Sequence, residues 1–248
     1  MLRKYSNSRS LKDNIQLGVL TAFAAGMVNV ASVIIFFSFT SNVTGHFAIL
    51  AEEISKQNWY QAAVVLAWIA AFFIGNFITN MIVIHSKERA RQLSHVIPLV
   101  LEIACLLSVG FYGQYFYQET LMETEWLVGI LLFAMGIQNG LTASISNFAV
   151  KTTHLTGLTT DLAILLSMFT KKDYRENEEL KGKAQLLLSV VTSYMIGGII
   201  AGVIILVAQF KVFWVASFVI VLVVLYDYSK VKVTRYIRTK RALGYMNE

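Results

Sequence analysis

The stretch Phe23-Ala-Ala-Gly-Met-Val-Asn29 decides the fold, because a similar stretch, Phe133-Ala-Met-Gly-Ile-Gln-Asn139, follows in the second half of the chain. A polar break rich in Ser, Thr and Asn comes after each copy, and a Thr-Gly pair comes after each break, at Thr44-Gly45 and at Thr156-Gly157. This common order of motifs predicts an internal repeat.

The chain as a whole is more apolar than a soluble domain. Of its 248 residues, 56% are hydrophobic and 15% are charged, against about 45–50% and about 25% in soluble proteins. This composition excludes a disordered chain, a disulfide-stapled scaffold and an ordinary cytosolic enzyme. The single cysteine, Cys105, lies in an apolar run and is interpreted as a small buried hydrophobic residue.

Six apolar runs are long enough to cross a hydrocarbon core, which takes about 20 residues. Their expected limits are Ile15–Phe37, Trp59–Ile84, Val96–Tyr117, Glu125–Ala149, Ala184–Ala208 and Val212–Tyr226. Two shorter segments, Thr44–Ile54 and Thr156–Thr170, follow the polar breaks. At about 1.5 Å per residue they reach roughly halfway across, so we expect them to be half-helices.

The charges indicate how the chain crosses the membrane. The net charge of +6 comes from basic residues that gather in short segments between the apolar runs, as in the cytoplasmic loops of membrane proteins. With both termini in the cytoplasm and six spans, only Lys56 and Lys211 of the 21 Lys and Arg residues lie outside. The lipid bilayer is therefore the expected partner, and nucleic acid is not.

Each copy of the repeat contains three spans, so the second copy must lie upside down relative to the first. The expected fold is an all-α membrane protein with six transmembrane helices in two inverted three-helix repeats, 15–117 and 125–228. Each repeat has a re-entrant or broken half-helix. A cytoplasmic N-terminal segment, 1–14, and a basic cytoplasmic tail, 229–248, complete the chain. Inverted repeats with interrupted helices are typical of channels and secondary transporters.

Four motifs resemble the YoaK family of bacterial membrane proteins, and the resemblance extends over nearly the whole chain. They are Ala25-Gly-Met-Val-Asn29, Ser41-Asn-Val-Thr-Gly-His46, Gly136-Ile-Gln-Asn139 and Thr152-Thr-His-Leu-Thr-Gly-Leu-Thr-Thr-Asp-Leu162. The family is defined as a domain of unknown function. The resemblance therefore implies a bacterial inner-membrane protein with five to seven helices, and it implies no substrate.

The expected solute site lies near the midplane, where the N-termini of the two half-helices meet. Each terminus offers unpaired backbone N–H groups and a positive dipole end, which suit an anionic or strongly polar solute. The candidate binding residues are Asn29, Thr44, Gly45, His46, Asn139, His154, Thr156, Gly157, Thr160 and Asp161.

Most of these residues also have a structural interpretation. Asn29 and Asn139 are either interhelical hydrogen-bonding groups worth about 1 kcal/mol or contacts to the solute. Thr156 can cap the second half-helix and Asp161 can bond a neighbour, whereas the density of hydroxyls around them favours a solute or ion contact.

The remaining titratable candidates are two histidines and one acid. His46 and His154 either titrate near neutral pH or are satisfied polar groups. No metal site is expected, because no third ligand is close to them in sequence. Glu102 lies inside a spanning run whose helix Pro98 is expected to open, and it is a candidate proton carrier. An ion pair with the basic cluster 87–91 is the favoured interpretation.

The leading functional hypothesis is a transporter or channel for a small polar solute, with anions favoured. One alternative is a non-catalytic accessory or assembly protein. A less favoured one is a membrane enzyme that acts on a lipid or quinone, with His154 and Asp161 as acid and base. The sequence contains no phosphate-binding loop, dinucleotide fingerprint or hydrolase motif. Neither an enzyme nor a cofactor is therefore expected, and a homo-oligomer is compatible with the sequence.

Overall fold

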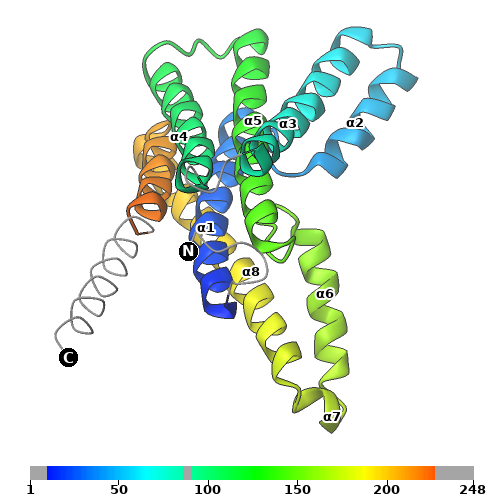
Figure 1. Cartoon of the computed structure of the whole chain (residues 1–248). Coiled ribbons are helices and arrows are strands. Elements are labelled where there is room, and N and C mark those ends of the chain that lie inside the picture. Colours follow the sequence, from blue (N-terminus) through cyan, green and yellow to red (C-terminus); the bar gives the residue numbers. More distant parts are fainter. Residues whose placement is uncertain (1–9, 86–90, 227–248) are drawn as a thin grey trace, which may run out of the picture.

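The computed structural model describes residues 10–85 and 91–226, and all regular structure in these ranges is helical. The expected all-α fold is confirmed. The labelled helices (Figure 1) are α1 (Leu11–Phe36), α2 (Val43–Ser55), α3 (Trp59–His85), α4 (Arg91–Tyr115), α5 (Leu121–Ser146), α6 (Leu155–Met168), α7 (Lys172–Arg175) and α8 (Glu178–Ala208). A further helix, Lys211–Tyr226, follows α8.

Five helices of the described residues are long and apolar enough to cross a membrane: α1, α3, α5, α8 and the Ser94–Tyr115 part of α4. The expected sixth span, Val212–Tyr226, lies in the helix Lys211–Tyr226. Within the described residues this helix is shorter than the five helices of membrane-crossing length. The expected N-terminal segment 1–14 overlaps α1, which begins at Leu11. Residues 1–9 and the basic tail 229–248 lie outside the described residues.

α2 and α6 are the two short helices that the sequence predicts. α2 has 13 residues and α6 has 14. An irregular segment precedes each: the first lead-in, residues 37–42, and the second lead-in, residues 147–154. The two short helices begin near each other and leave the middle of the molecule in opposite directions (Figure 1).

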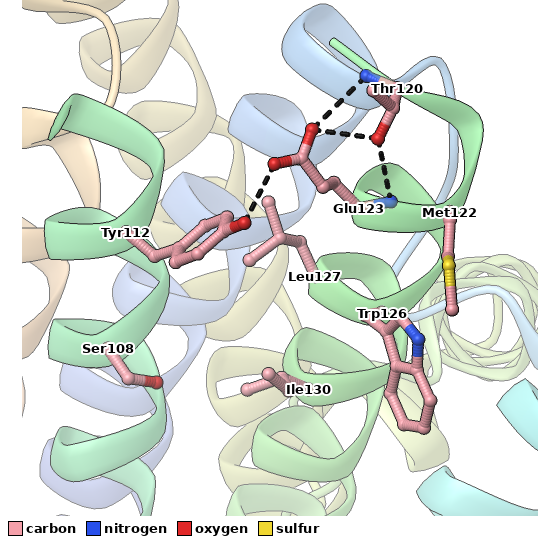
Figure 2. Close-up of a pocket in the computed structure, with 8 residues that line it drawn as sticks. All are labelled: Ser108, Tyr112, Thr120, Met122, Glu123, Trp126, Leu127 and Ile130. Atoms are coloured by element: carbon pink, nitrogen blue, oxygen red, sulfur yellow. Dashed lines mark hydrogen bonds between the residues drawn. The ribbon is translucent and has the colours of Figure 1, made fainter. Parts of the chain in front are cut away.

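α1 and α5, which carry the two copies of the repeated stretch, begin in the same way. A capping box starts each helix, with Ser10 and Asp13 at α1 and with Thr120 and Glu123 at α5. In each box the two side chains satisfy each other's backbone N–H groups. Figure 2 shows the second box, where the hydroxyl of Tyr112 also donates to Glu123 Oε1 at 2.7 Å.

The long helices cross in two matching pairs: α1 lies chiefly against α8, and α3 lies chiefly against α5. At the α1–α8 crossing, a Cβ added at Gly26 would clash with the backbone carbonyl of Tyr194. A Cβ added at Gly197 would clash with the carbonyl of Phe23. Only glycine lets the two backbones approach so closely.

The α3–α5 crossing has the same construction. A Cβ at Gly75 would clash with the carbonyl of Phe133, and one at Gly136 would clash with the carbonyl of Phe72. At both crossings each glycine meets the residue three positions before its partner glycine. α2 lies on α3, and α6 lies on α8, so each short helix accompanies one long helix of a crossing.

The outward faces of the long helices remain apolar. α3 exposes Phe73, Phe77 and Ile84, and α8 exposes Leu206 and Val207. Apolar side chains on this scale are consistent with contact to a lipid bilayer.

Candidate functional site

One amide holds the first lead-in in place. Asn29 lies in α1, and its Oδ1 accepts hydrogen bonds from the backbone N–H groups of Thr40 at 2.9 Å and Ser41 at 3.1 Å. Asn42 then caps α2 by accepting a hydrogen bond from the N–H of Gly45 at 3.1 Å. The Oδ1 of Asn29 is thus engaged by the backbone, and the first lead-in is anchored at its end next to α2.

His46 fastens α2 to its surroundings. Its side chain is buried, and its Nε2 donates to the carbonyl of Phe39 at 2.9 Å. The ring stands edge-on to that of Trp68, with ring centroids 5.5 Å apart. The ring is thus satisfied at Nε2, whereas its buried Nδ1 has no hydrogen-bond partner in the described residues.

The second lead-in is held differently. Its first residues have a left-handed backbone conformation, as at Phe148 with φ 61°. The N–H of Val150 donates to Ser146 Oγ at 2.9 Å. This N–H is therefore not bonded to the α5 amide that matches Asn29. That amide, Asn139, has a buried Oδ1 with no hydrogen-bond partner in the described part of the chain.

α6 begins without a side-chain cap. Its N-cap residue, His154, makes no capping hydrogen bond. The imidazole lies over the start of the helix, so that a Cβ added at Gly157 would clash with it. The first-turn N–H groups of α6 therefore have no side-chain acceptor, in contrast to those of α2.

The N-termini of both short helices line one cavity of about 540 Å³, which we call the central cavity. Its walls come from the two lead-ins, from the first turns of α2 and α6, and from facing turns of α3 and α5. Five of the candidate residues meet there: Thr44, Asn139, His154, Thr156 and Gly157.

The central cavity favours negative charge. Its lining residues include no Asp or Glu in the described ranges, and Lys151 is the basic residue among them, with His154 beside it. Lys151 Nζ also lies 5.9 Å from the ring centroid of Phe148, another lining residue. The N-terminus of α6 adds a partial charge of about +0.5. Hydroxyl and amide groups complete the polar part of the wall.

Five candidates do not line the central cavity: Asn29, Gly45, His46, Thr160 and Asp161. The first three hold the first lead-in and α2, as described above. Thr160 is exposed, and its hydroxyl donates to the carbonyl of Thr156 at 3.0 Å, one turn back on α6. The sequence groups these residues with the site because they are close along the chain, whereas helix geometry turns them away from it.

Asp161 lines a neighbouring cavity of about 410 Å³ between the second lead-in, α6 and α8, which we call the second cavity. Asp161 Oδ2 lies 3.4 Å from Nζ of Lys183 on α8. His154 and Gly157 line both cavities. Asp161 is thus next to the proposed site and not in it.

Glu102 is completely buried in α4, and neither carboxylate oxygen has a hydrogen-bond partner in the described ranges. The expected ion-pair partners of Glu102, the cluster 87–91, lie outside the residues whose side chains the structure describes. Pro98 does not open the helix, because α4 begins at Arg91 and Pro98 lies inside it. The missing N–H of this proline leaves one helical hydrogen bond unmade, and the helix continues nevertheless.

Ten lining residues of the central cavity were not among the candidates, and Asn76, Phe148 and Lys151 are three of them. Lys151 immediately precedes the Thr-Thr-His string, and its charge was attributed to a loop. Asn76 directly follows Phe73-Ile-Gly75, which Met195-Ile-Gly197 echoes in the second half, and it is concealed in an apolar run. Attention to polar residues beside repeat motifs would have found both.

Two other cavities border α4 and α5 and carry no candidate site. One, of about 400 Å³, contains Glu123, whose carboxylate the hydroxyls of Tyr112 and Thr120 satisfy (Figure 2). The other, of about 600 Å³, contains Glu125, which accepts hydrogen bonds from Tyr60 at 2.6 Å and Gln61 at 2.9 Å. Both are otherwise lined mainly by apolar groups. The described ranges contain no cluster of three His, Cys, Asp or Glu residues that could hold a metal ion.

The fold thus defines a helical protein with five helices of membrane-crossing length and a polar cavity between two short helices. The chain belongs to the family described as protein of unknown function (DUF1275), whose model matches residues 17–226. This match confirms the family resemblance stated from the motifs. Searches of curated proteins and of solved structures found no match.

Proposed function

We propose that the protein is a membrane transporter or channel for a small anionic solute, which binds in the central cavity. The observation that supports this proposal is that two helix N-termini, Lys151 and uncharged polar groups line one cavity without an Asp or Glu among its described residues. Helix N-termini bind anions through free N–H groups and the dipole. Irregular backbone at membrane depth is tolerated where it lines such a cavity.

An inverted repeat is part of the proposal. The α1–α8 and α3–α5 crossings are related if α1 corresponds to α5 and α3 to α8. Each glycine contact of one crossing then has its counterpart in the other, with Gly26 matching Gly136 and Gly197 matching Gly75. The same correspondence relates α2 on α3 to α6 on α8. Two copies related in this way would bring α2 and α6 into the membrane from opposite sides, as in secondary transporters.

The proposed setting is the bacterial inner membrane, with both termini in the cytoplasm and Lys211–Tyr226 as part of a sixth span. The distribution of Lys and Arg supports this orientation, since only Lys56 and Lys211 would lie outside. The family resemblance supports the bacterial membrane.

Each lining group has a proposed role. The uncapped first turn of α6 and Lys151 supply positive potential. The amide of Asn139 and the hydroxyls of Thr44 and Thr156 exchange for part of the hydration shell of the solute. In this proposal the side-chain NH₂ group of Asn139, which lines the cavity, donates to the solute.

The test is flux in proteoliposomes with a panel of small inorganic and carboxylate anions. Asn139→Ala and Lys151→Gln are expected to lower anion flux about tenfold or more, because each removes a contact worth roughly 1.5–3 kcal/mol to a charged solute. The matched controls are Asn80→Ala, which removes an amide that Ser144 contacts outside the cavity, and Lys56→Gln. No flux for the whole panel, or equal losses in the controls, would overturn the proposal.

We further propose that the chain is not an enzyme. Asp161 is paired with Lys183, and no hydrogen bond joins it to His154 in the described ranges. The acid-base pair that a lipid or quinone enzyme would need is therefore not supported. The accessory or assembly alternative has no observation in its favour, and a stable partner without solute flux would establish it.

A further inference from the structure

The second cavity adjoins the central cavity, and the two share four lining residues: Phe148, Lys151, His154 and Gly157. Two of these four are cationic or titratable, and Lys183 adds a second lysine at the far wall. A solute that leaves the central cavity past Lys151 therefore enters a space whose two lysines face one acid, Asp161.

The ion pair in the second cavity is easily opened. Lys183 Nζ and Asp161 Oδ2 are 3.4 Å apart, and the two side chains are 53% and 48% exposed. Ion pairs with this exposure contribute little to stability, because water and salt screen them. An anion can thus replace Asp161 at Lys183 at small cost.

The matching positions of the first half carry no charge. When the two halves are aligned on their Thr-Gly pairs, Lys151 corresponds to Phe39 and Asp161 to Ile49. Both Phe39 and Ile49 are exposed apolar residues. When they are aligned on Gly75 and Gly197, Lys183 corresponds to Gln61, whose side chain donates to Glu125. The charged groups are therefore confined to the side of α6 and α8 and are not a general property of the repeat.

We propose that the second cavity is an anion-binding chamber on the solute's route, where Lys183 exchanges Asp161 for the solute. This inference rests on the proposed function. Lys151 contacts both cavities and passes the anion between them, and Phe148 forms the apolar edge of the passage. Its left-handed backbone, φ 61°, follows the C-terminus of α5, where its N–H donates to the carbonyl of Ala143.

The experiment measures the preference of the chamber for anions without any flux. In a Cys105→Ala background, Ala149→Cys places a thiol on the wall of the second cavity. The protein in detergent is treated with an anionic or a cationic methanethiosulfonate, and mass spectrometry gives the ratio of the two labelling rates. Ala163→Cys, which is exposed on α6 outside both cavities, is the control position.

Opposite shifts are the expected result. Asp161→Asn should raise the anionic-to-cationic ratio at Ala149→Cys about fivefold, and Lys183→Gln should lower it by a similar factor, since one charge near the thiol changes in each case. The ratio at Ala163→Cys should change less. No shift of the ratio at Ala149→Cys in either variant, or an equal shift at Ala163→Cys, overturns the proposal.

Flux separates this proposal from the function on which it rests. Anion flux that is unaffected by Asp161→Asn and Lys183→Gln, with no shift in the labelling ratio, rejects the chamber and keeps the transporter. The expected ratios without flux of any anion in the panel reject the transporter, and they show that the chamber selects anions in a protein with another function.

Discussion

Asn29 and Asn139 stand at matching positions in the two halves, and their amide oxygens have opposite surroundings. The oxygen of Asn29 accepts two backbone N–H groups of the first lead-in. That of Asn139 has no partner in the described ranges, and its residue lines the central cavity. The N-caps differ in the same sense, since Asn42 caps α2 and His154 leaves α6 uncapped.

The difference teaches how one motif supplies both a support and a binding surface. In the first half the amides of Asn29 and Asn42 accept hydrogen bonds from the backbone that they hold, so they fix the start of α2 in place. In the second half the same kinds of groups keep their hydrogen-bonding capacity and face a cavity. A buried polar group without a partner is costly, and the Oδ1 of Asn139 is such a group in the described residues.

The largest expected effect tests where the two halves are alike. Gly26→Ala and Gly136→Ala should each lower the free energy of unfolding by about 3 kcal/mol, because the new Cβ meets a backbone carbonyl that cannot move alone. Thermal unfolding in detergent measures this. Gly202→Ala is the control, since its Cβ would find Ile34 Cδ1 at 3.9 Å, and it should not destabilise. Unequal effects at the two crossings would contradict their equivalence.

The next effect tests where the halves differ. Asn29→Ala should destabilise the protein by about 2 kcal/mol, because it leaves the N–H groups of Thr40 and Ser41 without their acceptor. Asn139→Ala removes no hydrogen bond of its Oδ1, so it should change stability by less than about 0.5 kcal/mol. Chemical denaturation of the two variants side by side is the measurement. Similar losses of stability in both variants would show that Asn29 and Asn139 do not differ in their structural role.

The smallest effect comes from the N-caps. Asn42→Ala should cost about 1 kcal/mol, since it removes the bond to Gly45. His154→Asn should gain a cap at α6 and raise the melting temperature slightly, while it occupies an N–H group that the solute would use. Anion flux should therefore fall as stability rises. A loss of stability in His154→Asn would show that α6 is already satisfied in another way.

Much of the fold could be predicted from the sequence, because long apolar runs and short polar breaks leave few arrangements. The limits of α2 and α6 follow from their Thr-Gly pairs, and those of α3 from the change in polarity at Trp59 and His85. The start of α4 was missed by five residues, since Val96 was expected to open the run and Arg91 begins the helix. Helix propensity there extends beyond the apolar stretch.

The site was predicted only in part, because closeness in sequence does not fix direction on a helix. Thr156 and Gly157 reach the central cavity, whereas Thr160, one turn later, points elsewhere. Asp161 was expected at the site, and its partner Lys183 lies on α8, where no motif indicates a contact. The unequal use of Asn29 and Asn139 could not be read from the repeat, because the two residues are identical.

The glycine contacts at the two crossings have a consequence for motion. At these points backbone meets backbone with no side chain between them, while buried side chains pack the helices together on either side. The α1–α8 and α3–α5 contacts are thus two points about which the paired helices can tilt. α2 packs on α3 and α6 packs on α8, so each short helix would move with one of these long helices. Rocking about these points would alter the access to the cavity between the short helices while the points themselves stay still.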